Sequence, residues 1–178
     1  MRTQPPLHLP VQGHTTVVAA LLGGGADAGA RDAAQGTALY CCASGGHIEI
    51  ARMLVEAGCP PSACVIAGQQ AIHFASQNNH PAFVEWLLDQ EVAVDPRTSQ
   101  GKCTPLHYAC MRGSVEAAAV LLRRGADPNA ADVDGQSCLS YAASAGSLKL
   151  VRLLLQHFPG LDVNAPDNCP VATTQLRR

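Results

Sequence analysis

Apolar residues recur at intervals of three or four along several short stretches of the chain, a pattern typical of helices with one buried face. The stretch that begins at Leu148 shows it most clearly and predicts a helix from Leu148 to about Gln156. Its inward positions are Leu148, Val151, Leu154 and Leu155. A second pattern predicts a shorter helix over residues 137–144, directly before it. Helices of this length are unstable alone because nucleation is costly, so we expect packing between neighbouring units to stabilise them.

The residues that precede these helices carry start signals. Ser137 stands where an N-cap hydroxyl belongs, and one unit earlier Thr104 followed by Pro105 forms a good pair for the N-cap and the first helical position. Residues 132–135 begin with Asp and end with Gly, a composition typical of a tight turn. The sequence therefore predicts a turn, a short helix and a longer helix in each unit.

Three markers repeat with one period. The segments that open the first helices start 33, 34 and 33 residues apart, and they are Thr37–Tyr40, Gln70–His73, Thr104–His107 and Ser137–Ser140. The pairs that close these helices keep the same intervals, and they are Gly46–His47, Asn79–His80, Gly113–Ser114 and Gly146–Ser147. A third marker is a Leu-Leu pair near the end of the second helix, followed by a Gly- or Asp-containing loop. Markers that share one period indicate an array of structural repeats.

The unit from Thr104 to Ala130 resembles the ankyrin repeat closely. It carries Thr-Pro-Leu-His at 104–107, Leu121–Leu122 in the second helix and Gly-Ala-Asp-Pro-Asn-Ala at 125–130. This resemblance covers roughly residues 13–168. It implies an all-α fold, an ankyrin-repeat solenoid of stacked helix-turn-helix units joined by β-turn fingers. It also implies that His73 and His107 are structural, each tying a helix start to a neighbouring turn.

The period divides the chain into an irregular N-terminal segment, an array and a tail. The predicted parts are residues 1–12, a partial first repeat at about 13–31, repeats at about 32–64, 65–97, 98–131 and 132–165, and a flexible C-terminal tail at 169–178. Pro5, Pro6 and Pro10 disfavour an intact helix before Gly13. Neither end shows the polar outer face of a terminal repeat, so we expect the chain to be a shortened form of a longer array with a low, shallow unfolding transition.

Composition narrows the class of protein. Aromatic residues make up 4% and charged residues 15% of the 178 residues, so the core must consist mainly of small and aliphatic side chains. The formal net charge of −2 provides no basic field for nucleic acid. We find no run long enough to span a bilayer and no apolar signal-peptide region. We therefore expect a monomer in the cytosol or nucleus, without membrane insertion.

The chemistry-bearing residues favour packing over catalysis. The eight cysteines form no CxxC pair, so we predict reduced thiols, with Cys42, Cys110 and Cys138 as small core residues and no metal or cofactor. Catalytic elbows, zinc-binding helices and phosphate loops are missing from the sequence. Adjacent Cys41 and Cys42 would point in different directions on a helix, which disfavours a thiol enzyme. We also expect Trp86 to pack inward.

If the family geometry holds, the fingers and the ends of the first helices form a concave face that binds a partner protein. The candidate contact residues are Ile66, Gln69, Gln77, Asn78, Arg97, Lys102, Met111, Arg112, Val133, Asp134 and Gln136. Residues 64–67 make an apolar fingertip, which either binds the partner or folds back on the adjacent finger. Charge variants Ile66→Asp and Arg112→Glu are expected to weaken a partner without changing the fold.

Two further hypotheses stay open. The spacing of Leu121, Asp127 and Asn129 looks like the site that an asparaginyl hydroxylase uses on ankyrin-repeat proteins, although Asn129 also suits a residue that closes the turn. The main functional hypothesis is a non-catalytic interaction module. The alternative is the substrate-recognition arm of a ubiquitin ligase complex, although residues 170–178 are too short for the box that recruits the ligase.

Overall fold

The computed structural model describes residues 15–33 and 35–158, without the side chain of Ile66. Nine α-helices lie in this part of the chain. The longer helices are α1 (Thr15–Gly23), α3 (Ile48–Glu56), α5 (Pro81–Asp89), α7 (Val115–Arg123) and α9 (Leu148–His157). The shorter helices are α2 (Ala38–Gly45), α4 (Ala71–Gln77), α6 (Pro105–Arg112) and α8 (Cys138–Ser144). A 3-10 turn, η1, covers Ile66–Gly68.

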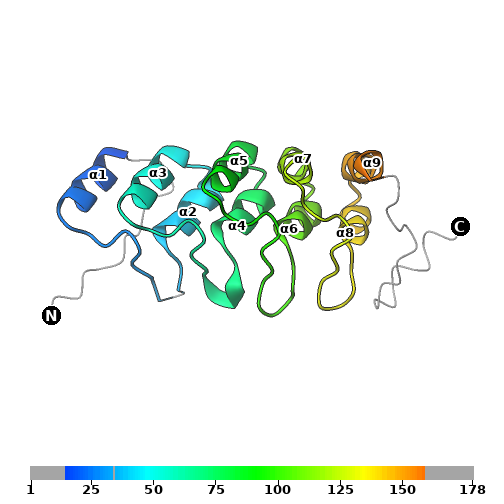
Figure 1. The fold of residues 1–178 in the computed structure, drawn as a ribbon, viewed down its shortest axis with the longest axis horizontal. Helices are drawn as coiled ribbons and strands as arrows, with labels where there is room; N and C mark the ends of the chain where they lie inside the picture. Colours follow the sequence, from blue (N-terminus) through cyan, green and yellow to red (C-terminus); the bar gives the residue numbers. More distant parts are fainter. Residues whose placement is uncertain (1–14, 34, 159–178) are drawn as a thin grey trace, which may run out of the picture.

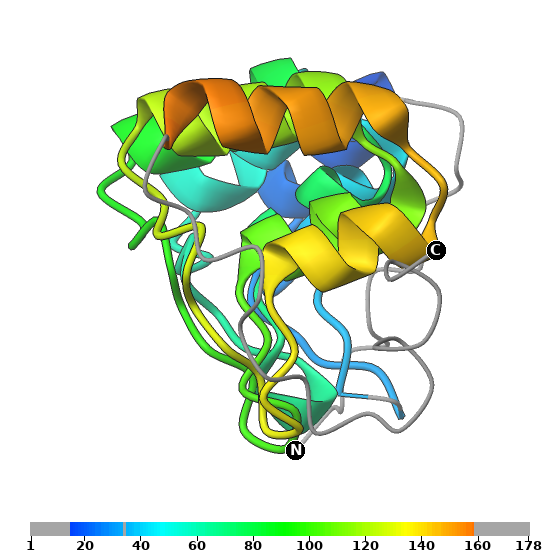
Figure 2. The ribbon, with the colours of Figure 1, turned by 90° about the vertical axis from the view of Figure 1, so that its right-hand side faces the viewer.

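The helices form two layers with loops projecting from one side (Figure 1). The odd-numbered helices make the outer layer and the even-numbered helices α2 to α8 make the inner layer. Viewed along the stack, the loops extend beyond the inner layer and lie over one another (Figure 2). Helices α2 to α9 pack in hairpin pairs and against helices of adjacent units, and α1 packs against α3. The prediction of an all-α ankyrin-repeat solenoid is confirmed.

The predicted caps start the inner helices. The hydroxyl of Thr37 accepts a hydrogen bond from the Tyr40 N–H at 3.4 Å, and that of Ser137 accepts one from the Ser140 N–H at 3.3 Å. Thr104 caps α6, with Pro105 as the first helical residue. These contacts satisfy backbone donors that a helix start leaves unpaired, so the local sequence sets where each helix begins.

The turn between inner and outer helices needs one residue with a positive φ. Gly46, Gly113 and Gly146 fill this position in three units, whereas Asn79 fills it at φ 57° in the fourth. The side chain of Asn79 reaches the next unit, where its Oδ1 accepts the Ala117 N–H at 3.1 Å and its Nδ2 donates to Glu116 at 2.6 Å. The turn of one repeat is thereby joined to the start of helix α7 in the next.

The core lies between the two helix layers and consists mainly of small and aliphatic residues. Leu39, Ile72 and Leu106 are fully buried at the same position of successive inner helices. The predicted burial of Cys42, Cys110 and Cys138 is confirmed, because all three lie in the core. Small side chains allow the close approach of helices in this layer.

Trp86 is buried in the outer layer, as predicted, with 6% of its surface exposed. Its ring meets the edge of Phe83 at a centroid distance of 5.3 Å, and the Arg52 guanidinium lies 5.9 Å from its centroid. Across the described ranges, no helix is long and apolar enough to cross a bilayer.

Candidate functional site

Four fingers project from the inner layer at residues 31–37, 64–70, 97–104 and 131–137. Three are closed by antiparallel bridges, such as the pair of Cys64 with Gln70, and the third is closed by a bond from the Thr98 N–H to the Cys103 carbonyl at 3.1 Å. Backbone bonds also join neighbouring fingers, from the Ser99 N–H to the Ala67 carbonyl at 2.8 Å and from the Val133 N–H to the Gly101 carbonyl at 2.9 Å. The fingers therefore form a continuous ribbed surface.

Two buried histidines fasten this surface to the inner helices. In His73, Nδ1 accepts the Gln70 N–H at 3.0 Å and Nε2 donates to the Pro96 carbonyl at 3.1 Å. His107 repeats the arrangement with Thr104 at 3.1 Å and the Gln136 carbonyl at 3.2 Å. Because Nδ1 is the acceptor, the proton must lie on Nε2. Burial lowers the pKa of His73 to about 4 and also lowers the pKa of His107, so both rings are neutral at pH 7.

Two arginines bridge the fingers from outside. The Arg97 guanidinium donates to the Ala131 carbonyl of the next finger at 2.8 Å and to the Lys102 carbonyl of its own at 3.5 Å. Arg31 makes the same pair of contacts two repeats earlier, with the carbonyls of Gln35 and Cys64. Arg97, which we predicted as a partner contact, is exposed but already serves to hold adjacent fingers in register.

The concave face is made of the fingers together with the side of the inner helices that faces them. Where the two meet lies a row of half-buried rings that comprises Tyr40, Phe74, Tyr108 and Tyr141, which we call the ring row. The Tyr108 hydroxyl accepts a hydrogen bond from Gln69, and the Tyr141 hydroxyl donates to Asp132 at 2.6 Å. Both partners are finger residues, so the rings are held in place from the fingers.

Edge-to-face contacts link the ring row across successive units. Tyr40 meets Phe74 at a centroid distance of 4.4 Å, while Tyr108 and Tyr141 meet the histidine rings of the preceding units at 5.3 and 5.7 Å. This row was not among the residues predicted from the sequence. The signal was present, because Phe74, Tyr108 and Tyr141 occur 34 and 33 residues apart, matching the period of the array.

The structure places most predicted contact residues on the concave face, where some side chains are exposed and others are half-buried. The exposed ones are Asn78, Arg97, Lys102, Met111, Arg112, Val133 and Asp134, and the half-buried ones are Gln69, Gln77 and Gln136. Met111 and Val133 expose 36% and 60% of their surfaces. The side chain of Ile66 lies outside the described part of the chain, whereas the neighbouring Ala67 is bonded to the next finger through its carbonyl.

Charge is distributed unevenly between the two sides of the stack. The segment 97–112 contains Arg97, Lys102 and Arg112 and no carboxylate. Within the described residues these three cations make no ion pair, whereas the ion pairs that do form lie on the outer helices, where Arg123 and Arg124 meet Glu85 and Asp89. The concave face of this unit therefore presents cations without an ion pair, and the next finger adds the exposed carboxylate of Asp134 beside the bond from the Val133 N–H to the Gly101 carbonyl.

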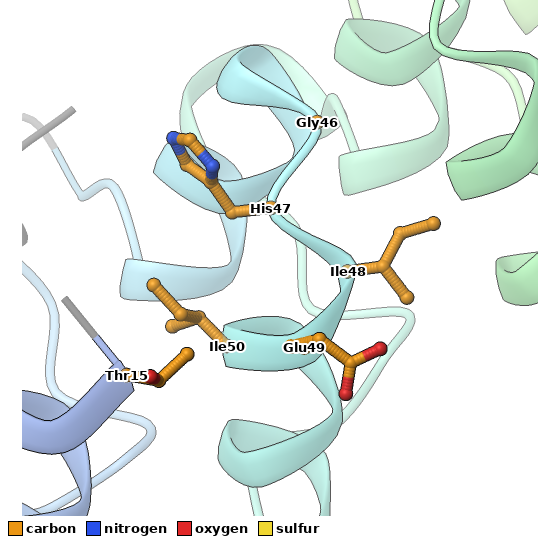
Figure 3. Close-up of a pocket in the computed structure, with 6 residues that line it drawn as sticks. All are labelled: Thr15, Gly46, His47, Ile48, Glu49 and Ile50. Atoms are coloured by element: carbon orange, nitrogen blue, oxygen red, sulfur yellow. The ribbon is translucent and has the colours of Figure 1, made fainter. Parts of the chain in front are cut away.

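A shallow hollow of about 360 Å³ lies elsewhere, at the starts of α1 and α3. Figure 3 shows it between Thr15 and the turn at Gly46 and His47, which is at the opposite end of α2 from the fingers. It shares no residue with the ring row. The hollow is therefore separate from the concave face.

Asn129 is exposed in the loop after α7. Its backbone N–H donates to the Asp127 carboxylate at 2.9 Å, so the Asp127 side chain closes this turn. The Asp127 N–H in turn donates to Asp95 of the preceding unit at 2.8 Å. The Asn129 side chain is thus presented on a loop that its neighbours hold in a fixed conformation.

Comparison with known proteins identifies the class to which this fold belongs. A family model described as ankyrin repeats (3 copies) matches residues 7–98 and 72–167, so the chain belongs to the ankyrin-repeat family. Members of this family are generally non-catalytic modules for protein interaction.

Two relatives illustrate the extent of similarity. The ankyrin repeat and KH domain-containing protein mask-1 of Caenorhabditis elegans is 34% identical over 146 residues, which are 81% of this chain and 6% of that protein. The B-cell lymphoma 3 protein homolog of Mus musculus is 41% identical over 122 residues, 66% of this chain and 27% of that protein. The chain thus spans little more than a quarter, or less, of each relative.

Proposed function

We propose that this chain is a non-catalytic module that binds a partner protein through its concave face. The observation that carries the proposal is the set of exposed Met111, Arg112, Lys102 and Val133 on a rigid surface, where apolar groups and unpaired cations lie together. Arg and Met are enriched in the cores of protein interfaces. A surface held by histidine, arginine and backbone bonds has little conformational entropy to lose on binding, which favours affinity.

The experiment compares two charge reversals in the same chain. Arg112→Glu changes the concave face, and Arg152→Glu makes the same change on exposed outer helix α9. Proteins captured from a cell lysate by wild type and by each variant are quantified by mass spectrometry. A specific partner should be retained by Arg152→Glu and lost with Arg112→Glu; equal retention by both variants excludes this part of the concave face.

We also propose a cellular compartment, an oligomeric state and an alternative complex for this chain. The seven cysteines of the described part are free thiols, which supports a reducing compartment such as the cytosol or nucleus. We propose a monomer, testable by light scattering. A role as the substrate-recognition arm of a ubiquitin ligase complex would use the same concave face and needs a recruiting element in addition. The Arg112→Glu variant therefore tests substrate binding in both cases.

A further inference from the structure

We propose that the partner segment bound by the concave face is a proline-rich stretch in polyproline II conformation that carries an acidic residue. The inference rests on the proposed interaction function and specifies the chemistry of its ligand. Its basis is the ring row Tyr40, Phe74, Tyr108 and Tyr141, together with the three cations of segment 97–112.

The spacing of the rings selects the ligand conformation. Phe74, Tyr108 and Tyr141 occupy the same position of successive inner helices, which pack directly side by side. Packed helices lie about 8–10 Å apart. A polyproline II helix rises about 3.1 Å per residue with three residues per turn, so one side chain in three returns to the same side after about 9 Å. Every third residue of such a segment would therefore meet one ring.

Other backbone conformations fit the row less well. A β-strand needs three residues to cover about 10 Å, and its alternation puts the third residue on the opposite face. An α-helix returns to one face after seven residues or about 10.5 Å, but its width of about 10–12 Å and its internally bonded carbonyls suit a broad apolar groove. Here the rings are only partly exposed, because each also packs against neighbouring side chains. Exposed aromatic side chains are a recognised surface for binding proline-rich segments.

The donors on the concave face match the acceptors of such a ligand. A polyproline II backbone has no internal hydrogen bonds, so its carbonyls are free to accept. The Arg112 guanidinium and the Lys102 ammonium have no acceptor among the described residues, and Arg112 follows Tyr108 by four residues, one turn along the same helix. Because segment 97–112 has three cations and no carboxylate, an acidic residue in the ligand would complement it beside Tyr108.

The test uses a displayed library of random peptides, somewhat longer than the roughly seven residues that span Phe74, Tyr108 and Tyr141. The library is selected on the intact chain, and the enriched peptides are synthesised and titrated by fluorescence anisotropy. The expected result is enrichment of prolines three residues apart with an Asp or Glu between them. Phe74→Ala and Tyr108→Ala should each weaken binding at least about tenfold, as for aromatic hot spots, while the outer-layer control Arg152→Glu should not.

A charge exchange guards against variants that merely unfold. Arg112→Glu should lower the affinity for the acidic peptides. Replacing the acidic residue of the peptide with Lys should restore binding to that variant. Circular dichroism shows whether each variant is folded. Enriched peptides that lack the three-residue proline period, or a selection without binders, would overturn the inference. If peptides without the proline period bind and their affinity is still lowered by Arg112→Glu, the proposed function is retained and the ligand assignment is wrong. Peptides whose affinity changes with neither the ring variants nor the charge variant would contradict the proposed function and the ligand assignment alike.

Discussion

The buried histidines should make the stability of the array depend on pH. His73 is fully buried and neutral, and folding lowers its pKa from 6.5 to about 4. Between these values the unfolded chain binds a proton that the folded chain does not, so the free energy of unfolding is greatest above about pH 6.5 and falls as pH drops toward about 4. At about 1.4 kcal/mol per pKa unit, the loss from His73 alone is about 3 kcal/mol near pH 4. His107 shifts in the same direction and adds to it.

Urea unfolding followed by Trp86 fluorescence would measure this effect, since Trp86 is the only tryptophan and is buried. Burial raises the pKa of Asp95, which opposes the histidines in acid, so the informative quantity is the difference between wild type and His73→Gln. The variant keeps an amide donor for the Pro96 carbonyl and cannot titrate. Its stability should fall less steeply with decreasing pH, whereas the non-titrating control Leu155→Ala should parallel wild type. Parallel profiles for wild type and His73→Gln would refute the reasoning.

Four further outcomes are expected. Leu106→Ala, at a fully buried site of α6, should lower the free energy of unfolding by about 2–5 kcal/mol in urea titration. Arg97→Ala should cost about 1 kcal/mol and speed amide hydrogen exchange in the fingers at 97–104 and 131–137, because it removes their guanidinium bridge. Incubation with an asparaginyl hydroxylase should add one oxygen at Asn129 by peptide mass mapping; an unchanged mass rejects that hypothesis. Alkylation of the native protein should modify exposed Cys64 and spare buried Cys42 until urea is added.

The sequence determined most of the fold because the relevant signals are local. A cap at Ser137, a proline at position 105 and apolar spacing from Leu148 act within one or two turns of helix, and α8 and α9 lie where these signals place them. The inward face of α9 was predicted only in part, because Leu148 and Leu155 are 60% and 40% exposed while Leu150 and Leu154 are buried. The repeat period then dictates that units stack, since no unit can bury its apolar face alone.

The details of the concave face depended on contacts between units, which no local pattern reveals. Arg97 is predicted to contact a partner protein, and its guanidinium also donates to a carbonyl 34 positions later in the chain, a bond that the local sequence does not indicate. The ring row was not predicted because a single aromatic residue in one unit indicates nothing, and Phe74, Tyr108 and Tyr141 form a row only when the repeats stack. Likewise, the Asp127 carboxylate closes the turn at Asn129, a role that composition alone could not assign between the two side chains.

Asn79 adopts an unfavourable backbone conformation in its own repeat and forms hydrogen bonds to the next repeat. A left-handed conformation costs a non-glycine residue about 1 kcal/mol. Asn79 has this conformation, and its side-chain amide forms two hydrogen bonds with the start of helix α7. Replacing it with glycine would relax one unit but remove two hydrogen bonds to the next, worth about 1 kcal/mol each, so total stability should fall modestly. The change would appear in the sharpness of the melting curve, because weaker nearest-neighbour terms let the two halves of the stack unfold independently.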